Sequence, residues 1–315
     1  MSRVALGTAL VAAAAALFGT LSYITRSADQ LGLGALPFVF WRGAVGTVAL
    51  LAVGLFIGRR LPTGRLSELL PPRRRALAIA ALLGALLNIA MFLAFVRTTI
   101  AVALIVFYVF PALVTLAAVR FYGERLDRVR AGALVLSAIG LALVVLVPVL
   151  GSTDVNVDPV GVALALGAAV CQASFILITG RGFAPLSPVR VATFAVAAAG
   201  AMALVLALIA GDLAGLALPF SETRAWVWIL VGGVTGAAIP TAFFVTGIGL
   251  IGPSRAAILM TIEPLVGVAL AGLLLGEHPT PVQLVGGAAV LATATILQVA
   301  PRHGRVPEPE LSPLV

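Results

Sequence analysis

The sequence predicts an all-α integral membrane protein with ten transmembrane helices in two inverted five-helix repeats. Three observations lead to this fold class. Of the 315 residues, 61% are hydrophobic and only 10% are charged, ten apolar runs follow one another, and one Pro–Glu spacing occurs twice. A soluble domain has about 25% charged residues. A chain this apolar is therefore expected to lie in lipid, as a multi-pass protein of a bacterial-type inner (plasma) membrane.

The ten apolar runs each have the length of a membrane-spanning helix. A helix rises 1.5 Å per residue, so about 20 residues cross a hydrocarbon core of about 30 Å. Lipid cannot hydrogen-bond backbone N–H and C=O groups, and the spans are therefore expected to be helical. In chain order the predicted spans are 4–24, 35–57, 76–96, 101–121, 131–149, 159–179, 191–210, 225–248, 256–275 and 281–299.

The duplicated spacing indicates an internal repeat. Pro111 is followed by Glu124 and Pro264 by Glu277, each pair thirteen residues apart, and the two copies are offset by 153 residues. An offset of about half the chain places five spans in each half. Because five is odd, the second half must insert upside down relative to the first, as in many transporters. We therefore expect repeats at 4–149 and 159–300, followed by a disordered cytoplasmic tail at 301–315.

The arginines predict the orientation. All twenty basic residues are Arg. If the N-terminus is cytoplasmic, sixteen arginines fall on inner segments and only Arg26, Arg97 and Arg224 on outer ones. Cytoplasmic loops carry an excess of basic residues, so both termini are expected in the cytoplasm. The net charge of +8 has this topological origin, and nucleic acid is not an expected partner. The apolar run after Arg3 is interpreted as an uncleaved first helix rather than a signal peptide.

Few residues are available for metal or enzyme chemistry. Cys171 is the only cysteine, and His278 and His303 are the only histidines. We therefore expect no metal site, cofactor or catalytic residue. Two alternatives to transport are an integral membrane enzyme acting on lipid-linked substrates and a scaffold or sensor that moves nothing. The enzyme would need His, Asp or Glu clustered at one membrane face, and the sequence has no such cluster.

The order of these features resembles the drug/metabolite transporter superfamily, specifically its ten-helix EamA type, over about residues 4–300. The resemblance rests on both Pro–Glu endings, Glu263-Pro264, Phe40-Trp41-Arg42, and the glycines Gly132 and Gly286 that follow. It implies two inverted repeats around a central cavity that moves small metabolites by alternating access. It also implies a secondary transporter of the inner membrane, with export of amino acids or related amphiphilic compounds as the expected activity.

Two charged residues inside spans are the leading site candidates. Glu263 is the only acid well inside a span, and a charge in mid-membrane costs at least about 2.5–3.5 kcal/mol. It is expected to couple transport to protons or bind a substrate amine, or else to bond a neighbouring helix. Arg42 is the only Arg inside a span. It is expected to bind a substrate carboxylate, pair with Glu263, or snorkel towards the outer face.

The remaining candidates are uncharged. Asn88 and Thr241, and likewise Tyr108 and Thr261, occupy equivalent positions in the two repeats, and Gln172 is polar in mid-span. These five residues are expected to line the cavity or to hydrogen-bond between helices.

Three further kinds of residue complete the candidates. Trp41 is a candidate for stacking on substrate, with packing as the alternative. Pro111 and Pro264 are candidate hinges that shape their helices, because each lacks a backbone N–H. Glu124 and Glu277 are interpreted as structural, either capping the following spans or pairing with Arg.

Overall fold

The computed structural model describes residues 2–58, 66–122, 128–150, 157–179, 183, 185–251, 256, 259–277 and 279–299. These residues form helices and connecting turns, with no strand among them. The helices of the first half are α1 (Arg3–Gln30), α2 (Ala35–Gly58), a short 3₁₀ turn η1 (Leu66–Glu68), α3 (Pro71–Arg97), α4 (Ile100–Phe107), α5 (Phe110–Tyr122) and α6 (Arg128–Leu150). Those of the second half are α7 (Pro159–Thr179), α8 (Pro188–Ile209), α9 (Leu213–Ser221), α10 (Ala225–Gly233), the π-helix η2 (Val234–Ala238), α11 (Ile239–Ile251), α13 (Ile262–Leu275) and α14 (Pro281–Val299).

The all-α prediction is confirmed, and every predicted span corresponds to helical structure. Within the described residues, seven helical segments are long and apolar enough to cross a membrane. The remaining three predicted spans correspond to shorter apolar helices within α6, α13 and α14. The count of ten crossings stays a prediction. One helix was not foreseen: α9 lies in the segment 211–224, which the sequence analysis treated as an outer loop.

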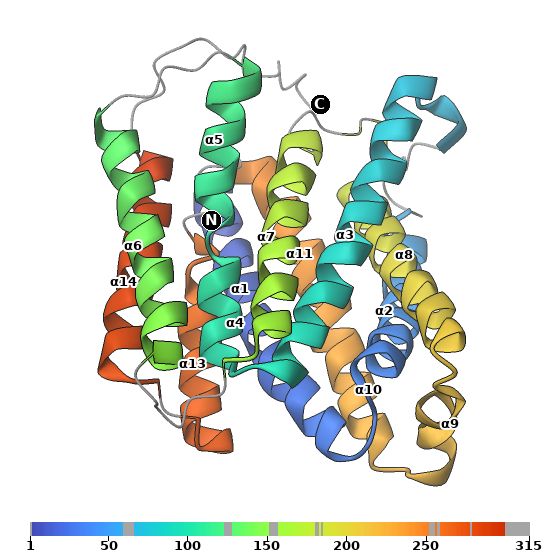
Figure 1. Cartoon of the computed structure of the whole chain (residues 1–315). Helices are drawn as coiled ribbons and strands as arrows, with labels where there is room; N and C mark the ends of the chain where they lie inside the picture. Colours follow the sequence, from blue (N-terminus) through green and yellow to red (C-terminus); the bar gives the residue numbers. More distant parts are fainter. Residues whose placement is uncertain are drawn as a thin grey trace.

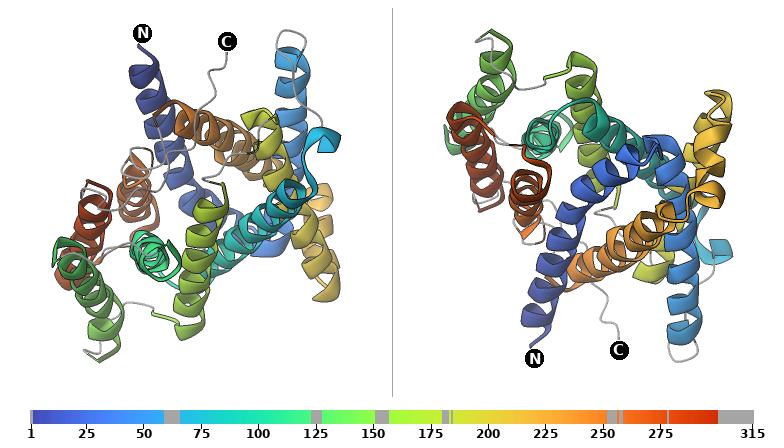
Figure 2. Two further views of the ribbon diagram at one scale, coloured as in Figure 1. Left: turned by 90° about the horizontal axis from the view of Figure 1, so that it is seen from above. Right: turned by 90° about the horizontal axis from the view of Figure 1, so that it is seen from below.

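The helices pair across the two halves in a symmetric pattern. The most extensive pairings are α1 with α11, α2 with α8, α3 with α7, and α6 with α14. Numbered by predicted span, these are 1 with 8, 2 with 7, 3 with 6, and 5 with 10. Exchanging the two halves converts each pairing into itself or into another member of the set. This pattern is the one expected of two repeats related by a pseudo-two-fold axis. Figures 1 and 2 show the bundle, with α6 and α14 side by side at its edge.

Both spans that carry the repeated proline are interrupted just before it. The first span divides at residues 108–109, between α4 and α5, and the second turns at residues 260–261, before α13. Pro111 is the second residue of α5, and Pro264 is the third of α13. Backbone N–H groups in a first helical turn have no helical partner, so proline is tolerated there. The prolines thus begin new helical segments instead of kinking continuous ones.

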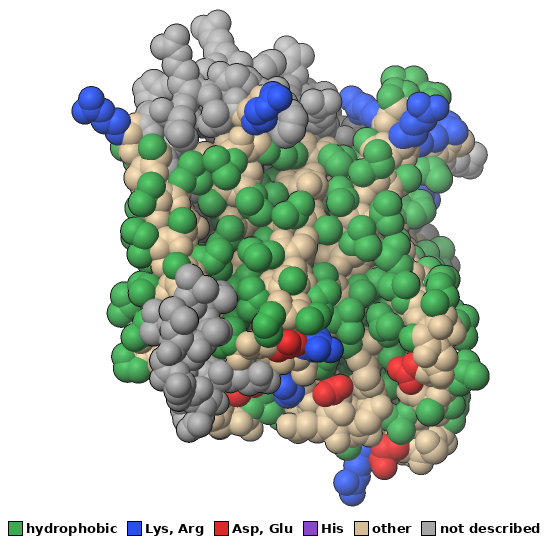
Figure 3. Space-filling model, in the orientation of Figure 1, with side chains coloured by type: hydrophobic (Ala, Val, Ile, Leu, Met, Phe, Trp, Pro, Cys, Tyr) green, Lys and Arg blue, Asp and Glu red, His purple; other side chains and the backbone are tan. Residues whose placement is uncertain are grey.

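The outer surface is predominantly apolar between two charged ends. In Figure 3, hydrophobic side chains cover the middle of the visible face, as a surface in contact with lipid requires. Arg side chains gather at the upper end of this view, whereas acidic and basic side chains both occur at the lower end. We use "lower end" for the end at which α1 and α3 finish and α4 and α7 begin (Figure 1).

Candidate functional site

A cavity of about 180 Å³ lies between the two halves of the bundle. Its lining comes from α1, α2, α3, the α4–α5 segment, α7, α8, η2, α11 and the α13 segment. The wall is largely apolar, as small-molecule sites usually are. Its phenylalanines are Phe18, Phe92, Phe95, Phe107, Phe110, Phe175 and Phe244. Six of the eight predicted binding or coupling residues also line it: Arg42, Asn88, Tyr108, Gln172, Thr241 and Glu263.

Arg42 is the most deeply buried charged group of the cavity, with 4% of its surface exposed. One terminal nitrogen donates to Asn88 Oδ1 at 2.7 Å, and the other donates to the Gly236 carbonyl at 3.1 Å. The guanidinium lies over the ring of Phe92, 4.5 Å from its centroid, which is a cation–π contact. Asn88 is itself held by donating to the Gly84 carbonyl at 2.8 Å. The guanidinium is therefore fixed in position, while its Nε has no hydrogen-bond partner among the described residues.

The Gly236 carbonyl cannot accept the usual α-helical hydrogen bond. An α-helical carbonyl accepts from the N–H four residues later. The residue four positions after Gly236 is Pro240, which has no N–H. Gly236 also belongs to the π-helix η2, a kind of insertion that often marks functional sites. The π-helix η2 was not predicted, although Pro240 inside an apolar span was a usable signal.

Tyr108 and Glu263 meet in the cavity, each beside the interruption of its span. Tyr108 has only 2% of its surface exposed, and its hydroxyl donates to the main-chain carbonyl of Met260. The same hydroxyl oxygen lies 3.1 Å from Glu263 Oε2. Glu263 is half-buried at the start of α13. The two interrupted spans therefore touch through one tyrosine hydroxyl.

Arg42 and Glu263 do not form an ion pair, although the structure describes both. The two ion pairs among the described residues are Arg26–Glu277 and Arg97–Asp158. The alternative in which Arg42 neutralises Glu263 is therefore not what the structure shows. The snorkelling alternative also fails, because Arg42 is buried and hydrogen-bonded inside the bundle.

Two predicted site residues lie apart from the cavity lining. The Trp41 indole donates to the Leu216 carbonyl of α9 at 3.0 Å, and its ring packs against Phe220 and Trp226. Trp41 therefore holds the short helix α9 against the bundle. Thr261 occupies the turn before α13. We leave both residues out of the proposed site.

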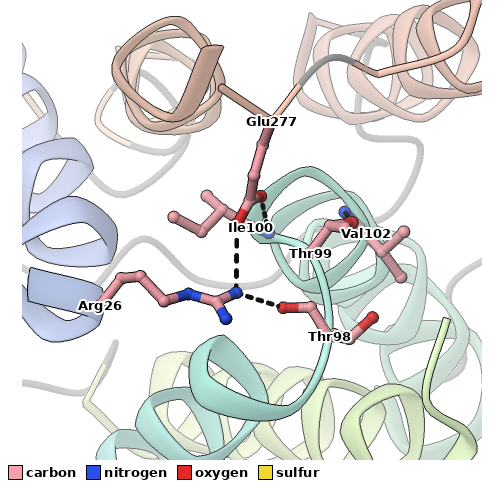
Figure 4. Close-up of polar contacts among 6 residues, drawn as sticks. All are labelled: Arg26, Thr98, Thr99, Ile100, Val102 and Glu277. Carbon is pink, nitrogen blue, oxygen red and sulfur yellow. Dashed lines mark hydrogen bonds and ion pairs between the residues drawn. The ribbon is translucent and has the colours of Figure 1, made fainter. Parts of the chain in front are cut away.

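Glu277 caps a helix, but not the one that follows it. Its Oε2 accepts from the Ile100 backbone N–H at 2.8 Å, at the start of α4, and its Oε1 lies 3.2 Å from Arg26 (Figure 4). The following helix, α14, is capped instead by Thr280 and Gln283, which exchange reciprocal hydrogen bonds. The prediction that Glu277 caps the following span is wrong, while the predicted partnership with Arg is confirmed. Glu124 lies outside the described residues.

The second ion pair joins the end of α3 to the start of α7. Arg97 Nε donates to Asp158 Oδ2 at 2.5 Å, and Asp158 Oδ1 accepts from the Val160 backbone N–H at 3.3 Å. The hydrogen bond from Arg97 is the main reason that the pKa of Asp158 lies below its usual value. Asp158 therefore acts as a charged cap of α7 at the lower end.

Comparison with known proteins supports the arrangement found in the structure. The model of the EamA-like transporter family matches residues 5–146 and, separately, residues 159–298. An uncharacterized transporter of Archaeoglobus fulgidus is 29% identical over 92% of this chain and 95% of its own length. Another, from Synechocystis sp., is 27% identical over 68% of this chain and 63% of its own length.

A solved structure has the same fold. One crystal structure superimposes with a TM-score of 0.56 at 22% identity, over 92% of this chain and 95% of the other. Since the family model matches both halves, this chain belongs to the EamA-like transporter family and is a multi-pass membrane transporter.

Proposed function

We propose that this protein is a secondary transporter of the inner membrane that exports amino acids or related amphiphilic compounds by alternating access. The observation that carries the proposal is the cavity between the two halves. Its wall combines an aromatic surface with the fixed cation Arg42 and the acid Glu263. Such a site accepts an apolar body and orients its polar end.

Arg42 favours a substrate that carries an anionic group. A charge inside the membrane costs at least about 2.5–3.5 kcal/mol, and in the part of the chain that the structure describes Arg42 pairs with neutral oxygens only. A substrate carboxylate would supply the missing counter-charge. Within the described residues the buried Nε–H of Arg42 has no acceptor, which leaves one donor of the guanidinium unsatisfied. Phe92, already stacked on the guanidinium, and the other phenylalanines would contact the apolar part of the substrate.

Glu263 favours coupling to protons. A tyrosine hydroxyl has a single proton, and Tyr108 donates it to the Met260 carbonyl. The 3.1 Å contact with Glu263 is then best satisfied when the carboxyl is protonated and donates to the tyrosine oxygen. Loss of that proton would leave two oxygens facing each other without a donor. Protonation of Glu263 would thus alter the contact between the two interrupted spans.

The charge distribution supports cytoplasmic termini. Under this orientation the lower end of Figure 1 is the outer end of the protein. The three arginines assigned to the outer side are Arg26, Arg97 and Arg224, and the first two pair there with Glu277 and Asp158. The orientation rests on the count of arginines, sixteen on inner segments against these three, because topology follows the basic residues and not the net charge.

A metabolite screen in proteoliposomes tests the proposal. Vesicles holding the purified protein would be loaded with a mixture of amino acids and related carboxylates, with or without a pH gradient. We expect gradient-dependent loss of at least one amphiphilic compound relative to protein-free vesicles. If every compound leaves at the protein-free rate under both conditions, the transport proposal is wrong.

A further inference from the structure

The strongest polar network outside the cavity joins three elements at the lower end (Figure 4). Arg26 of α1 donates to the Thr98 carbonyl in the α3–α4 turn at 2.7 Å. The same terminal nitrogen lies 3.2 Å from Glu277, directly after α13, and Glu277 also accepts from the Ile100 N–H. The Arg26–Glu277 ion pair therefore connects the first half of the chain to the second. Each of its two residues also hydrogen-bonds to the backbone of the α3–α4 turn.

This network lies beyond the cavity on each of the elements it connects. On α1, Leu21 lines the cavity and Arg26 follows five residues later, or about 7.5 Å along the helix axis. On α3, Phe95 lines the cavity and Thr98 follows almost immediately. On the second half, Glu263 lines the cavity and Glu277 follows at the far end of α13. The network thus closes the lower end of the space between the halves.

The cavity extends the other way. Val191, in the first turn of α8, lines it, and that turn belongs to the upper end. Phe175 and Ile176, near the end of α7, line it as well. At the lower end, by contrast, Thr98 and Ile100 are fully buried. The lining therefore reaches towards the upper end, whereas the residues of the network at the lower end are buried and do not line the cavity.

We propose that Arg26 and Glu277 form the gate at the lower end, and that the gate opens when α1 separates from the end of α13. This inference rests on the proposed alternating access. Opening would break the ion pair, whereas the bond from Arg26 to the Thr98 carbonyl and the bond from the Ile100 N–H to Glu277 each join only one of the separating segments to the turn. Under the proposed orientation, the gate faces the outside of the cell.

The chemistry of the pair suits a contact that is broken in every cycle. Each side chain is 20% exposed, so water reaches both charges and can solvate them when they separate. An ion pair that water partly reaches costs less to separate than a fully buried one. The other pair at this end is a matched contrast. Arg97 and Asp158 join α3 and α7, two helices that pack extensively against each other, so this pair is expected to stay closed.

Cysteine accessibility tests the gate without knowledge of the substrate. In a Cys171→Ala background, Met91→Cys places a reporter on the cavity wall. The full-length protein would be labelled with a membrane-impermeant maleimide in right-side-out and inverted membrane vesicles. With the pair intact, we expect labelling only from the side of the upper end. Glu277→Gln keeps an acceptor for the Ile100 N–H but removes the charge.

We expect Glu277→Gln to raise labelling from the lower side by about fivefold. This factor corresponds to the upper end of the free energies measured for exposed ion pairs. Arg26→Gln tests the same pair independently if the first variant does not fold. Asp158→Asn, which breaks the neighbouring pair, is expected to leave labelling unchanged. Two results would overturn the gate proposal. One is strong labelling from the lower side with the pair intact. The other is parental labelling in whichever of the two gate variants folds. A negative flux screen alongside the expected labelling would instead count against transport and leave the gate standing.

Discussion

The hydroxyl of Tyr108 donates to the main-chain carbonyl of Met260, which connects the interruption of one broken span to the interruption of the other. The two residues lie 152 positions apart, close to the repeat offset. Each interruption leaves backbone groups without helical partners in the middle of the bundle. A side chain from one repeat therefore satisfies the backbone of the other, so a movement of either segment alters both. Glu263 lies at the same contact, so a change in its protonation would alter the hydrogen bonding between the two halves.

The first prediction concerns Tyr108→Phe, which removes the hydroxyl and leaves the Met260 carbonyl without its donor. We expect a loss of about 1 kcal/mol in the free energy of unfolding, as for one lost hydrogen bond at a buried acceptor. The thermal midpoint of the detergent-solubilised protein should fall accordingly. Tyr23→Phe is the matched control, because the hydroxyl of Tyr23 makes no hydrogen bond within the described part of the protein. Equal midpoints for the two variants would contradict the bridging role of Tyr108.

The second prediction concerns Glu263→Gln, which keeps the shape and polarity of the side chain but cannot lose a proton. We expect the purified variant to fold with an unchanged elution profile, and its flux to become insensitive to the pH gradient. Glu68→Gln removes an exposed acid in η1 and should leave the gradient response intact. Parental flux in Glu263→Gln at every pH tested would eliminate the coupling role.

The third prediction concerns Arg42→Gln, which removes a buried cation that has no acidic partner. Stability should change little, because removal of a buried charge offsets the loss of its hydrogen bonds to Asn88 and Gly236. Affinity for an anionic substrate should fall about tenfold or more, the value of one charged hydrogen bond. The KM for the compound that the screen identifies measures this effect. Arg3→Gln is the control, because it removes the same charge from an exposed position, and it should leave the KM unaltered. A parental KM in Arg42→Gln would remove Arg42 from the binding site.

Much of the fold follows from one-dimensional features of the sequence. Spans of about 20 apolar residues must be helical in lipid, and a duplicated Pro–Glu spacing with an odd number of spans indicates inversion. The candidate site was found in large part by the same reasoning, since polar residues in apolar spans rarely face lipid. Asn88 and Tyr108 were identified in this way and do line the cavity.

The partners of these residues were not predictable, because they depend on contacts between distant parts of the chain. Glu277 is followed by a loop and a helix, so its role as a cap for α4 became visible only in three dimensions. Trp41 sits beside Arg42 in the sequence, yet successive residues on a helix point in different directions, and Trp41 faces α9. The helix α9 lies within the predicted outer segment 211–224. That segment is too short to span the membrane, so its length did not indicate a helix.

The fourth prediction concerns the pH dependence of the Arg97–Asp158 pair. The folded-state pKa of Asp158 is lowered, first of all by the hydrogen bond from Arg97, below an unfolded value of about 3.9. The stabilisation is therefore fully present above that unfolded value and is lost as the pH falls through the lowered folded pKa. Asp158→Asn should reduce the thermal midpoint at neutral pH, and the difference from the parent should shrink as the pH falls below the unfolded pKa of about 3.9.

A double variant provides the check on this assignment. Once Asp158→Asn is present, Arg97→Gln should cause little further loss, because residues in direct contact are not independent. A midpoint difference that stays constant from neutral to acidic pH would show that the pair does not stabilise the folded state through the charge of Asp158.

The fifth prediction concerns the close approach of α2 and α8. A Cβ added to Gly43 would lie 2.8 Å from the Cα of Gly200 and 3.1 Å from its backbone nitrogen, so the helices would have to move apart. Such overpacking usually costs about 1–3 kcal/mol, and Gly43→Ala should lower the thermal midpoint. Gly167→Ala is the matched control, since a Cβ there meets nothing within 4 Å. Because α2 carries Arg42, the displacement should also reduce substrate affinity, whereas Gly167→Ala should leave both measurements at the parental value. Equal midpoints for the two variants would mean that α2 and α8 do not depend on this glycine contact.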